Sequence, residues 1–194
     1  MKFISFWYDK PGNNYYKNAC ERLSAQMKIY NYDFLFEELS FDNSSYEHIT
    51  LHKPTFILDK LEQLNTPVCW IDIDCQIIRR INLDIFDSDI CLGRRDPEKK
   101  APHASVIFIN NNDQNKQFLL EWKKRCDQQK NDPNYEGGDH CQLILTYQNY
   151  DLNTINIKQI DNLCSTQLNS YIHIGISNGG REAENIKFRK FGSC

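Results

Sequence analysis

The segment Pro67-Val68-Cys69-Trp70-Ile71-Asp72-Ile73-Asp74 constrains the fold and the chemistry of this chain more than any other stretch. Residues 68–73 are apolar at nearly every position, which is typical of an inner strand covered by helices on both faces. Because side chains alternate along a strand, we expect Asp72 and Asp74 to point to one face, together with Trp70. Two adjacent carboxylates repel each other, and Mg²⁺ or Mn²⁺ relieves this repulsion by binding their oxygens. The segment therefore predicts a divalent-cation site at the end of a buried strand.

Strands and helices alternate on both sides of this segment. Apolar runs predict strands over residues 2–8, 33–39, 68–73, 89–93, 105–110, 155–160 and 171–176. Apolar residues at helical spacing predict helices over residues 16–30, 52–64, 119–126 and 139–147. This order predicts an α/β domain with a mixed, mostly parallel central sheet flanked by helices, whose ligands bind at the carboxyl ends of the strands.

Length, charge and hydropathy exclude several classes of protein. The chain has 194 residues, with 23 basic and 26 acidic side chains and a net charge of −3. This size fits one domain, which we place at residues 1–180, followed by a tail at residues 181–194. The slightly acidic balance argues against nucleic-acid binding, which needs clustered lysine and arginine. A mean hydropathy of −0.64 predicts no membrane span, and the apolar start of the chain is too short for a signal peptide.

The eight cysteines are scattered singly, and no two of them form a C-x-x-C pair. The usual spacings of zinc sites and redox motifs are therefore missing. Several cysteines lie inside apolar segments, where a thiol packs like a small hydrophobic side chain. We therefore expect reduced structural thiols and a cytoplasmic protein, because disulfides are rare in that compartment.

Residues 53–54, which open a predicted helix, and the segment 67–74 that follows it together resemble the D-x-D region of GT-A-fold glycosyltransferases. The resemblance is to small transferases that use nucleotide-diphosphate sugars, including virus-encoded and bacterial ones, and it extends over residues 1–180. Residues 105–110 are similar to the strand that lines the donor-sugar pocket of that family. Residues 137–143 are similar to its acidic segment, with His140 in place of the usual glutamine, and residues 171–175 to its late histidine segment.

The resemblance implies a GT-A-like fold and transfer of a sugar from a nucleotide-diphosphate donor, which we expect to be a UDP-sugar, to a glycan or other acceptor with retention of configuration. It implies a Mn²⁺ or Mg²⁺ ion held by Asp74 and His173, with Asp72 on the metal or on the ribose. Such a cation neutralises the charge that develops on the leaving diphosphate. The alternative for His173 is a hydrogen-bonded core residue. Asp139 is expected near the anomeric carbon, as nucleophile, orienting group or base, and it also suits a helix N-cap.

Four further residues are expected to bind the donor. Tyr8, at the end of the first strand, is placed to stack on the base, although strand aromatics also pack in cores. Lys53 and Arg181 are expected to add positive charge at the diphosphate, the alternative for Arg181 being a solvated tail. Ser105 begins the strand that is expected to line the sugar pocket.

Two other hypotheses remain open, a degenerate transferase-fold binding module without catalysis and a HAD-like phosphatase. The phosphatase needs its D-x-D on an early strand with threonine or valine two residues after the second aspartate, where this chain has Gln76. A P-loop and a G-x-S-x-G elbow are missing from the sequence. The oligomeric state is left open. A chain of this length has room for a near-minimal catalytic domain without an anchor, so we expect an acceptor that is soluble or presented by another molecule.

Overall fold

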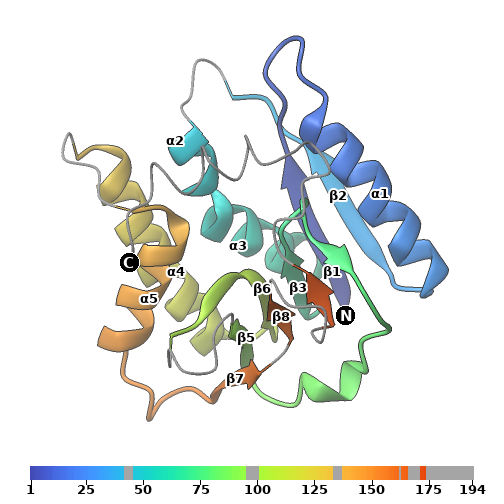
Figure 1. Cartoon of the computed structure of the whole chain (residues 1–194). Helices are drawn as coiled ribbons and strands as arrows, with labels where there is room; N and C mark the ends of the chain where they lie inside the picture. Colours follow the sequence, from blue (N-terminus) through green and yellow to red (C-terminus); the bar gives the residue numbers. More distant parts are fainter. Residues whose placement is uncertain (42–45, 95–100, 133–136, 162, 166–170, 174–194) are drawn as a thin grey trace.

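Within the residues that the structure describes, a six-stranded sheet forms the centre of the protein (Figure 1). Its strands, in spatial order, are β2 (Phe34–Glu38), β1 (Lys2–Trp7), β3 (Val68–Ile71), β6 (His103–Ile109), β5 (Ile90–Arg94) and β7 (Ile157–Asp161). A smaller sheet contains β4 (Gln76–Ile77), β9 (Ile172–His173) and β8 (Cys164–Ser165), in that order. The structure is a computed structural model that describes residues 1–41, 46–94, 101–132, 137–161, 163–165 and 171–173.

The central sheet is mixed, because β6 runs antiparallel to both of its neighbours, β3 and β5. The other pairs, β1 with β2, β1 with β3 and β5 with β7, are parallel. The amino end of β6 therefore lies at the same edge of the sheet as the carboxyl ends of the other strands. This arrangement confirms the predicted α/β class and the mostly parallel sheet.

Helices cover both faces of the central sheet (Figure 1). The helices are α1 (Tyr15–Ile29), α2 (Tyr46–Thr50), α3 (Lys53–Leu64), α4 (Asp113–Lys130) and α5 (Asp139–Asn149), with a 3₁₀ turn, η1 (Leu83–Ile85). One core lies between the sheet and α3, α4 and α5. The other core lies between the opposite face of the sheet, α1 and the small sheet. No helix among the described residues has both the length and the apolar character that crossing a bilayer requires.

Strand β3 contributes to both cores, because consecutive side chains alternate between its faces. Val68 and Trp70 pack in the core under α3, whereas Cys69 and Ile71 pack in the core under α1. All four residues are buried, as expected for an inner strand. The prediction of a two-sided buried strand at this position is therefore confirmed.

The predicted strand at 68–73 is too long, and this changes the placement of the two aspartates. Strand β3 ends at Ile71, and the chain then turns, with the N–H of Cys75 donating to the carbonyl of Asp72 at 2.9 Å. Asp72 and Asp74 therefore belong to a turn between β3 and β4, and strand alternation does not set their directions. We call residues 72–75 the D-x-D turn.

Six of the eight cysteines are free thiols: Cys20, Cys69, Cys75, Cys91, Cys126 and Cys164. Cys141 is disulfide-bonded, so the expectation of reduced thiols is wrong at that position. Burial, together with the nearby Cys91 and Cys164 sulfurs, raises the pKa of the Cys69 thiol well above its ordinary value. A thiol with a raised pKa is a poor nucleophile. These cysteines therefore act as packing groups in the cores.

Candidate functional site

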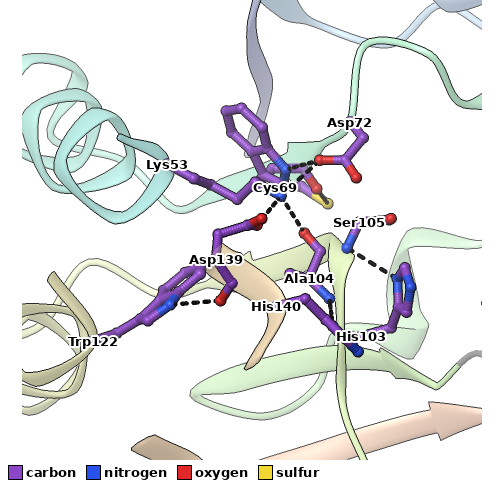
Figure 2. Close-up of polar contacts among 10 residues, drawn as sticks. Lys53, Cys69, Asp72, His103, Ala104, Ser105, Trp122, Asp139 and His140 are labelled. Carbon is purple, nitrogen blue, oxygen red and sulfur yellow. Dashed lines mark hydrogen bonds and ion pairs between the residues drawn. The ribbon is translucent and has the colours of Figure 1, made fainter. Parts of the chain in front are cut away.

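A buried lysine joins three elements at the edge of the sheet where β3 ends (Figure 2). Lys53 is the first residue of α3, and Pro54 behind it suits the first helical turn because proline lacks the N–H that would be unpaired there. The Lys53 Nζ atom lies 2.8 Å from Oδ1 of Asp72 and 2.6 Å from Oδ2 of Asp139. It also donates to the carbonyl of Ala104 at 3.1 Å. The ammonium is therefore held within the protein by two hydrogen bonds and a second ion pair.

The charges of this cluster stabilise one another. Burial alone lowers the pKa of Lys53, which is only 5% exposed, but the carboxylates of Asp139 and Asp72 outweigh that effect and raise it. Burial alone raises the pKa of Asp72, but the Lys53 ammonium and hydrogen bonds from Lys53, Ser105 and Trp70 lower it to about 2. Two carboxylates share one ammonium, so the cluster carries one excess negative charge.

Asp72 is also oriented by an aromatic residue of β3, two positions before it in the chain. The indole Nε1 of Trp70 donates to Oδ1 of Asp72 at 2.8 Å. The Lys53 ammonium lies 5.1 Å from the centre of the Trp70 ring, within the range of a cation–π contact. Two donors therefore fix the same carboxylate oxygen, and the indole and the ammonium are held together.

Asp139 is placed by the start of α5. Gly138 is the N-cap residue of this helix, and Asp139 is its first residue, so the N-cap alternative for Asp139 is wrong. Its carboxylate instead binds Lys53, in a first helical turn where a negative charge is favoured by the helix dipole. The fully buried Trp122 of α4 donates from Nε1 to the Asp139 carbonyl at 3.0 Å and fixes its backbone.

Side chains of α1 form hydrogen bonds with the D-x-D turn and with the strand that follows it. Arg22 donates from a terminal guanidinium nitrogen to the carbonyl of Asp74 at 3.3 Å. The side-chain amide of Gln26 pairs with the backbone of Ile77 in both directions, at 3.2 and 3.0 Å. At the amino end of the same helix, the Asp9 carboxylate accepts backbone N–H groups of Tyr16 and Lys17 at 3.0 and 2.8 Å. Helix α1 thus holds both the loop after β1 and the loop after β3.

Strand pairing brings the expected third metal ligand toward the D-x-D turn. In the small sheet the backbone of His173 lies directly opposite Gln76, two residues after Asp74. Asp74 is 5% exposed. Among the described residues, no group of three or more histidine, cysteine or acidic side chains is arranged as a metal site. Carboxylate oxygens are nevertheless the donors that Mg²⁺ and Mn²⁺ prefer, so the chemistry of Asp72 and Asp74 fits the expected cation.

Aromatic rings gather beyond the carboxyl ends of β1 and β2. Phe41 contacts the rings of Tyr8, Phe6 and His52, with centroids 5.7, 6.1 and 5.5 Å apart. Burial lowers the pKa of His52 in this cluster. Tyr8 is half-buried, so its ring packs on Phe41 and also reaches the surface.

The structure brings together four of the residues singled out from the sequence: Lys53, Asp72, Ser105 and Asp139. Tyr8 lies in the aromatic cluster that includes His52, the neighbour of Lys53. Arg181 lies outside the described residues. Trp122, His103 and Ala104 carry no signal of a role at the site in the sequence, and His140 carries one only because it stands where glutamine is usual in the resembled segment.

Two surface grooves lie away from this cluster. One of about 430 Å³ follows α4, and one of about 500 Å³ lies between α3 and α4. Neither is lined by Lys53, Asp72 or Asp139. The candidate site is therefore identified by its buried charges.

Comparison with known proteins supports the fold assignment only. No protein-family model matches the sequence, and no curated protein is significantly similar to it. The structure is similar to a crystal structure of a glycosyltransferase involved in the glycosylation of the major capsid of PBCV-1, with a TM-score of 0.64. The two chains are 14% identical, and the match covers 96% of this chain and 97% of the other. The chain therefore shares the fold of that protein.

Proposed function

We propose that this protein is a glycosyltransferase that uses a nucleotide-diphosphate sugar, a UDP-sugar in the first instance, together with Mn²⁺ or Mg²⁺. The observation that carries the proposal is the buried cluster of Lys53, Asp72 and Asp139 beside the D-x-D turn. This cluster lies at the carboxyl end of an inner strand, where α/β sheets bind their ligands. The fold shared with a known glycosyltransferase supports the same activity.

Asp72 and Asp74 are the residues that we propose hold the cation, with His173 as third ligand. When bound, the cation supplies positive charge against the leaving nucleoside diphosphate. In the transfer, the bond between the anomeric carbon and the diphosphate breaks, a bond to the acceptor oxygen forms, and the proton of that oxygen passes to the leaving diphosphate. Lys53 keeps the carboxylate of Asp72 ionised and in place, because its ion pair lowers the pKa of Asp72 to about 2. The cation ligand is therefore ready at neutral pH.

Asp139 is the carboxylate that we propose lies beside the donor sugar. Its ion pair with Lys53 fixes Oδ2, so the other oxygen is left to face the sugar. We keep Ser105 as a lining residue of the sugar pocket, Tyr8 as the platform for the base, and Arg181 as a diphosphate ligand. Retention of configuration and a glycan acceptor belong to the same proposal.

The first experiment measures thermal shifts of the protein with UDP and a panel of UDP-sugars, with Mn²⁺ and with EDTA. We expect a nucleotide-induced shift that requires Mn²⁺, because ligands that bind the native state raise its stability by mass action. Asp74→Ala is expected to remove the dependence on Mn²⁺. Asp59→Asn, an exposed aspartate of α3, is the matched control and is expected to behave like the wild type. Equal UDP binding in EDTA and in Asp74→Ala would disprove the metal role.

The second experiment measures release of UDP from the sugar that gives the largest shift. Slow hydrolysis of the donor is expected from a transferase without its acceptor. Donor binding with no hydrolysis, in the presence of Mn²⁺ and of candidate glycans, would favour the binding module. Turnover of a generic phosphate ester would favour the phosphatase.

A further inference from the structure

A bulge interrupts the sheet beside the candidate site. Between β5 and β6 the register runs from Leu92 opposite Ile107 directly to Gly93 opposite His103. Residues 104–106 of β6 therefore lie opposite the single peptide link between Leu92 and Gly93 of β5. Val106 pairs with Ile71 of β3, but Ala104 and Ser105 are outside both registers. Buried backbone groups need hydrogen-bond partners, so the groups of these two residues must bind elsewhere.

The two carbonyl groups of the bulge bind the candidate site. The carbonyl of Ala104 accepts from Nζ of Lys53 at 3.1 Å, and the carbonyl of Ser105 accepts from the backbone N–H of Asp72 at 2.8 Å. The bulge thus holds the lysine and the first aspartate of the D-x-D turn at once. Its orientation decides where both of them lie.

The two N–H groups of the bulge bind histidines (Figure 2). The N–H of Ala104 donates to Nδ1 of His140, and the N–H of Ser105 donates to Nδ1 of His103, each at 3.3 Å. The centres of the two imidazole rings are 4.5 Å apart. His140 follows Asp139 directly, so a closed circuit runs from Lys53 through Asp139, His140 and Ala104 back to Lys53.

We propose that His140, supported by the adjacent ring of His103, is a positioning residue that holds the bulge of β6 and thereby fixes Lys53 and Asp72. In this arrangement, the site assembles only when Nδ1 of His140 carries no proton. It rests on the proposed function where turnover is concerned, but the hydrogen bond itself is testable without any substrate.

The dependence on protonation follows from the direction of the hydrogen bonds. A neutral imidazole accepts through one nitrogen, whereas an imidazolium donates through both and cannot accept the N–H of Ala104. Histidine side chains change their charge between about pH 8 and pH 5. Two charged rings at this separation would also repel each other.

Several described charged groups lie on the elements packed around α5 and β6, which carry the two rings. They include Lys53 on α3, Asp72 after β3, Asp139 on α5, the ion pair of Arg94 on β5 with Asp161 on β7, and Lys123 and Lys130 on α4, both paired with Asp127. Arg94 and Asp161 neutralise each other, whereas Lys53, Asp72 and Asp139 together carry one excess negative charge. We expect acid to act through the loss of the two Nδ1 acceptors.

The deciding measurement is amide hydrogen exchange of Ala104, followed by NMR as a protection factor between pH 8 and pH 5. In the wild type we expect protection at pH 8 that falls by about tenfold in acid, the effect of losing one hydrogen bond. His140→Ala is expected to show the low value at every pH. His140→Asn places an amide oxygen close to the position of Nδ1, so its protection should be high and independent of pH. His48→Asn, at an exposed histidine of α2, is the control and should keep the wild-type profile.

Two results would overturn the proposal: wild-type protection of Ala104 that does not change with pH, or the same acid loss in His140→Asn as in the wild type. Neither depends on the folding of His140→Ala. If the protein turns over a UDP-sugar, kcat should fall in acid for the wild type but less so for His140→Asn, with KM little changed. A protein without turnover would count against the proposed function alone, because the exchange measurement stands by itself.

Discussion

The Nζ atom of Lys53 lies 2.6 Å from Oδ2 of Asp139, and each of the two residues is the first of its helix. The ion pair therefore joins the amino ends of α3 and α5 on one face of the sheet. Both partners are nearly buried, with 6% and 12% of their side chains exposed. Charges in such surroundings are costly to leave unpaired, so the contact is a sensitive point of the fold.

We expect Lys53→Met to lower the free energy of unfolding by about 3–5 kcal/mol, because two carboxylates lose their shared counter-ion. Asp139→Asn should cost less, and the double variant should cost less than the sum of the two changes. Urea unfolding of the four proteins measures this coupling. Lys60→Met is the matched control, since Lys60 is also buried but pairs with Glu37 away from the site. Additive effects of Lys53→Met and Asp139→Asn would contradict the ion pair.

Asp72 predicts a loss of stability in acid. Its pKa is lowered to about 2 in the folded protein, below the value of about 3.9 in an unfolded chain. A lowered pKa stabilises the fold above the unfolded value, and that contribution is lost as the pH falls from about 4 to about 2. We expect about 2 kcal/mol to disappear over this range. Unfolding free energies of the wild type and Asp72→Asn should converge as the pH falls, and curves that stay parallel would refute the assignment.

Trp70→Phe removes one donor to Asp72 but keeps the aromatic ring. We expect a cost of about 1–3 kcal/mol and a higher pKa of Asp72, so acid unfolding should begin at a higher pH. Trp122→Phe is the matched comparison, because Trp122 donates to a backbone carbonyl and not to a carboxylate. It should destabilise the protein by a similar amount without moving the onset of acid unfolding. Acid titrations followed by circular dichroism separate the two, and an identical shift in both variants would contradict the prediction.

Gly93, at the edge of the bulge, has no room for a larger side chain. A Cβ atom at this position would overlap the Sγ atom of Cys164. We expect Gly93→Ala to cost about 1–3 kcal/mol, the usual cost of overpacking a core. Cys164→Ala should suppress the effect, because the remaining neighbours, the Val106 carbonyl oxygen at 3.5 Å and the Cβ atom of residue 164 at 3.7 Å, lie at ordinary contact distances. Thermal unfolding of the single and double variants checks this, and a Gly93→Ala protein as stable as the wild type would contradict it.

Much of the fold was predictable, because long apolar and amphipathic segments carry a clear period. The inner strand at 68–71 and the helix that starts at Lys53 are examples. Two-residue strands such as β4 and β8 are too short to show any period, so the apolar pattern does not predict them. The end of β3 at Ile71 depends on a turn hydrogen bond between Asp72 and Cys75, which the apolar pattern does not reveal.

The candidate site was predictable by residue but not by contact. The sequence singles out Lys53, Asp72 and Asp139 because they lie at the ends of predicted elements. The residues around each of them do not indicate that one ammonium binds both carboxylates. The bulge of β6 was equally hidden, since it arises from the register of two strands. His140 stands where the resembled segment usually has glutamine, so the resemblance predicts no role for it. Its hydrogen-bond partner, Ala104, lies on another element and is visible only in the structure.

Helix α1 has a consequence for the dimensions of the site. Asp9 binds this helix at Tyr16 and Lys17, and Asp74 is bound by Arg22 about 8–9 Å further along the axis at 1.5 Å per residue. The loop proposed to bind the base and the turn proposed to bind the cation are thus both hydrogen-bonded to one helix. Helix α1 therefore fixes the distance between them, and with it the length of nucleotide that can reach both.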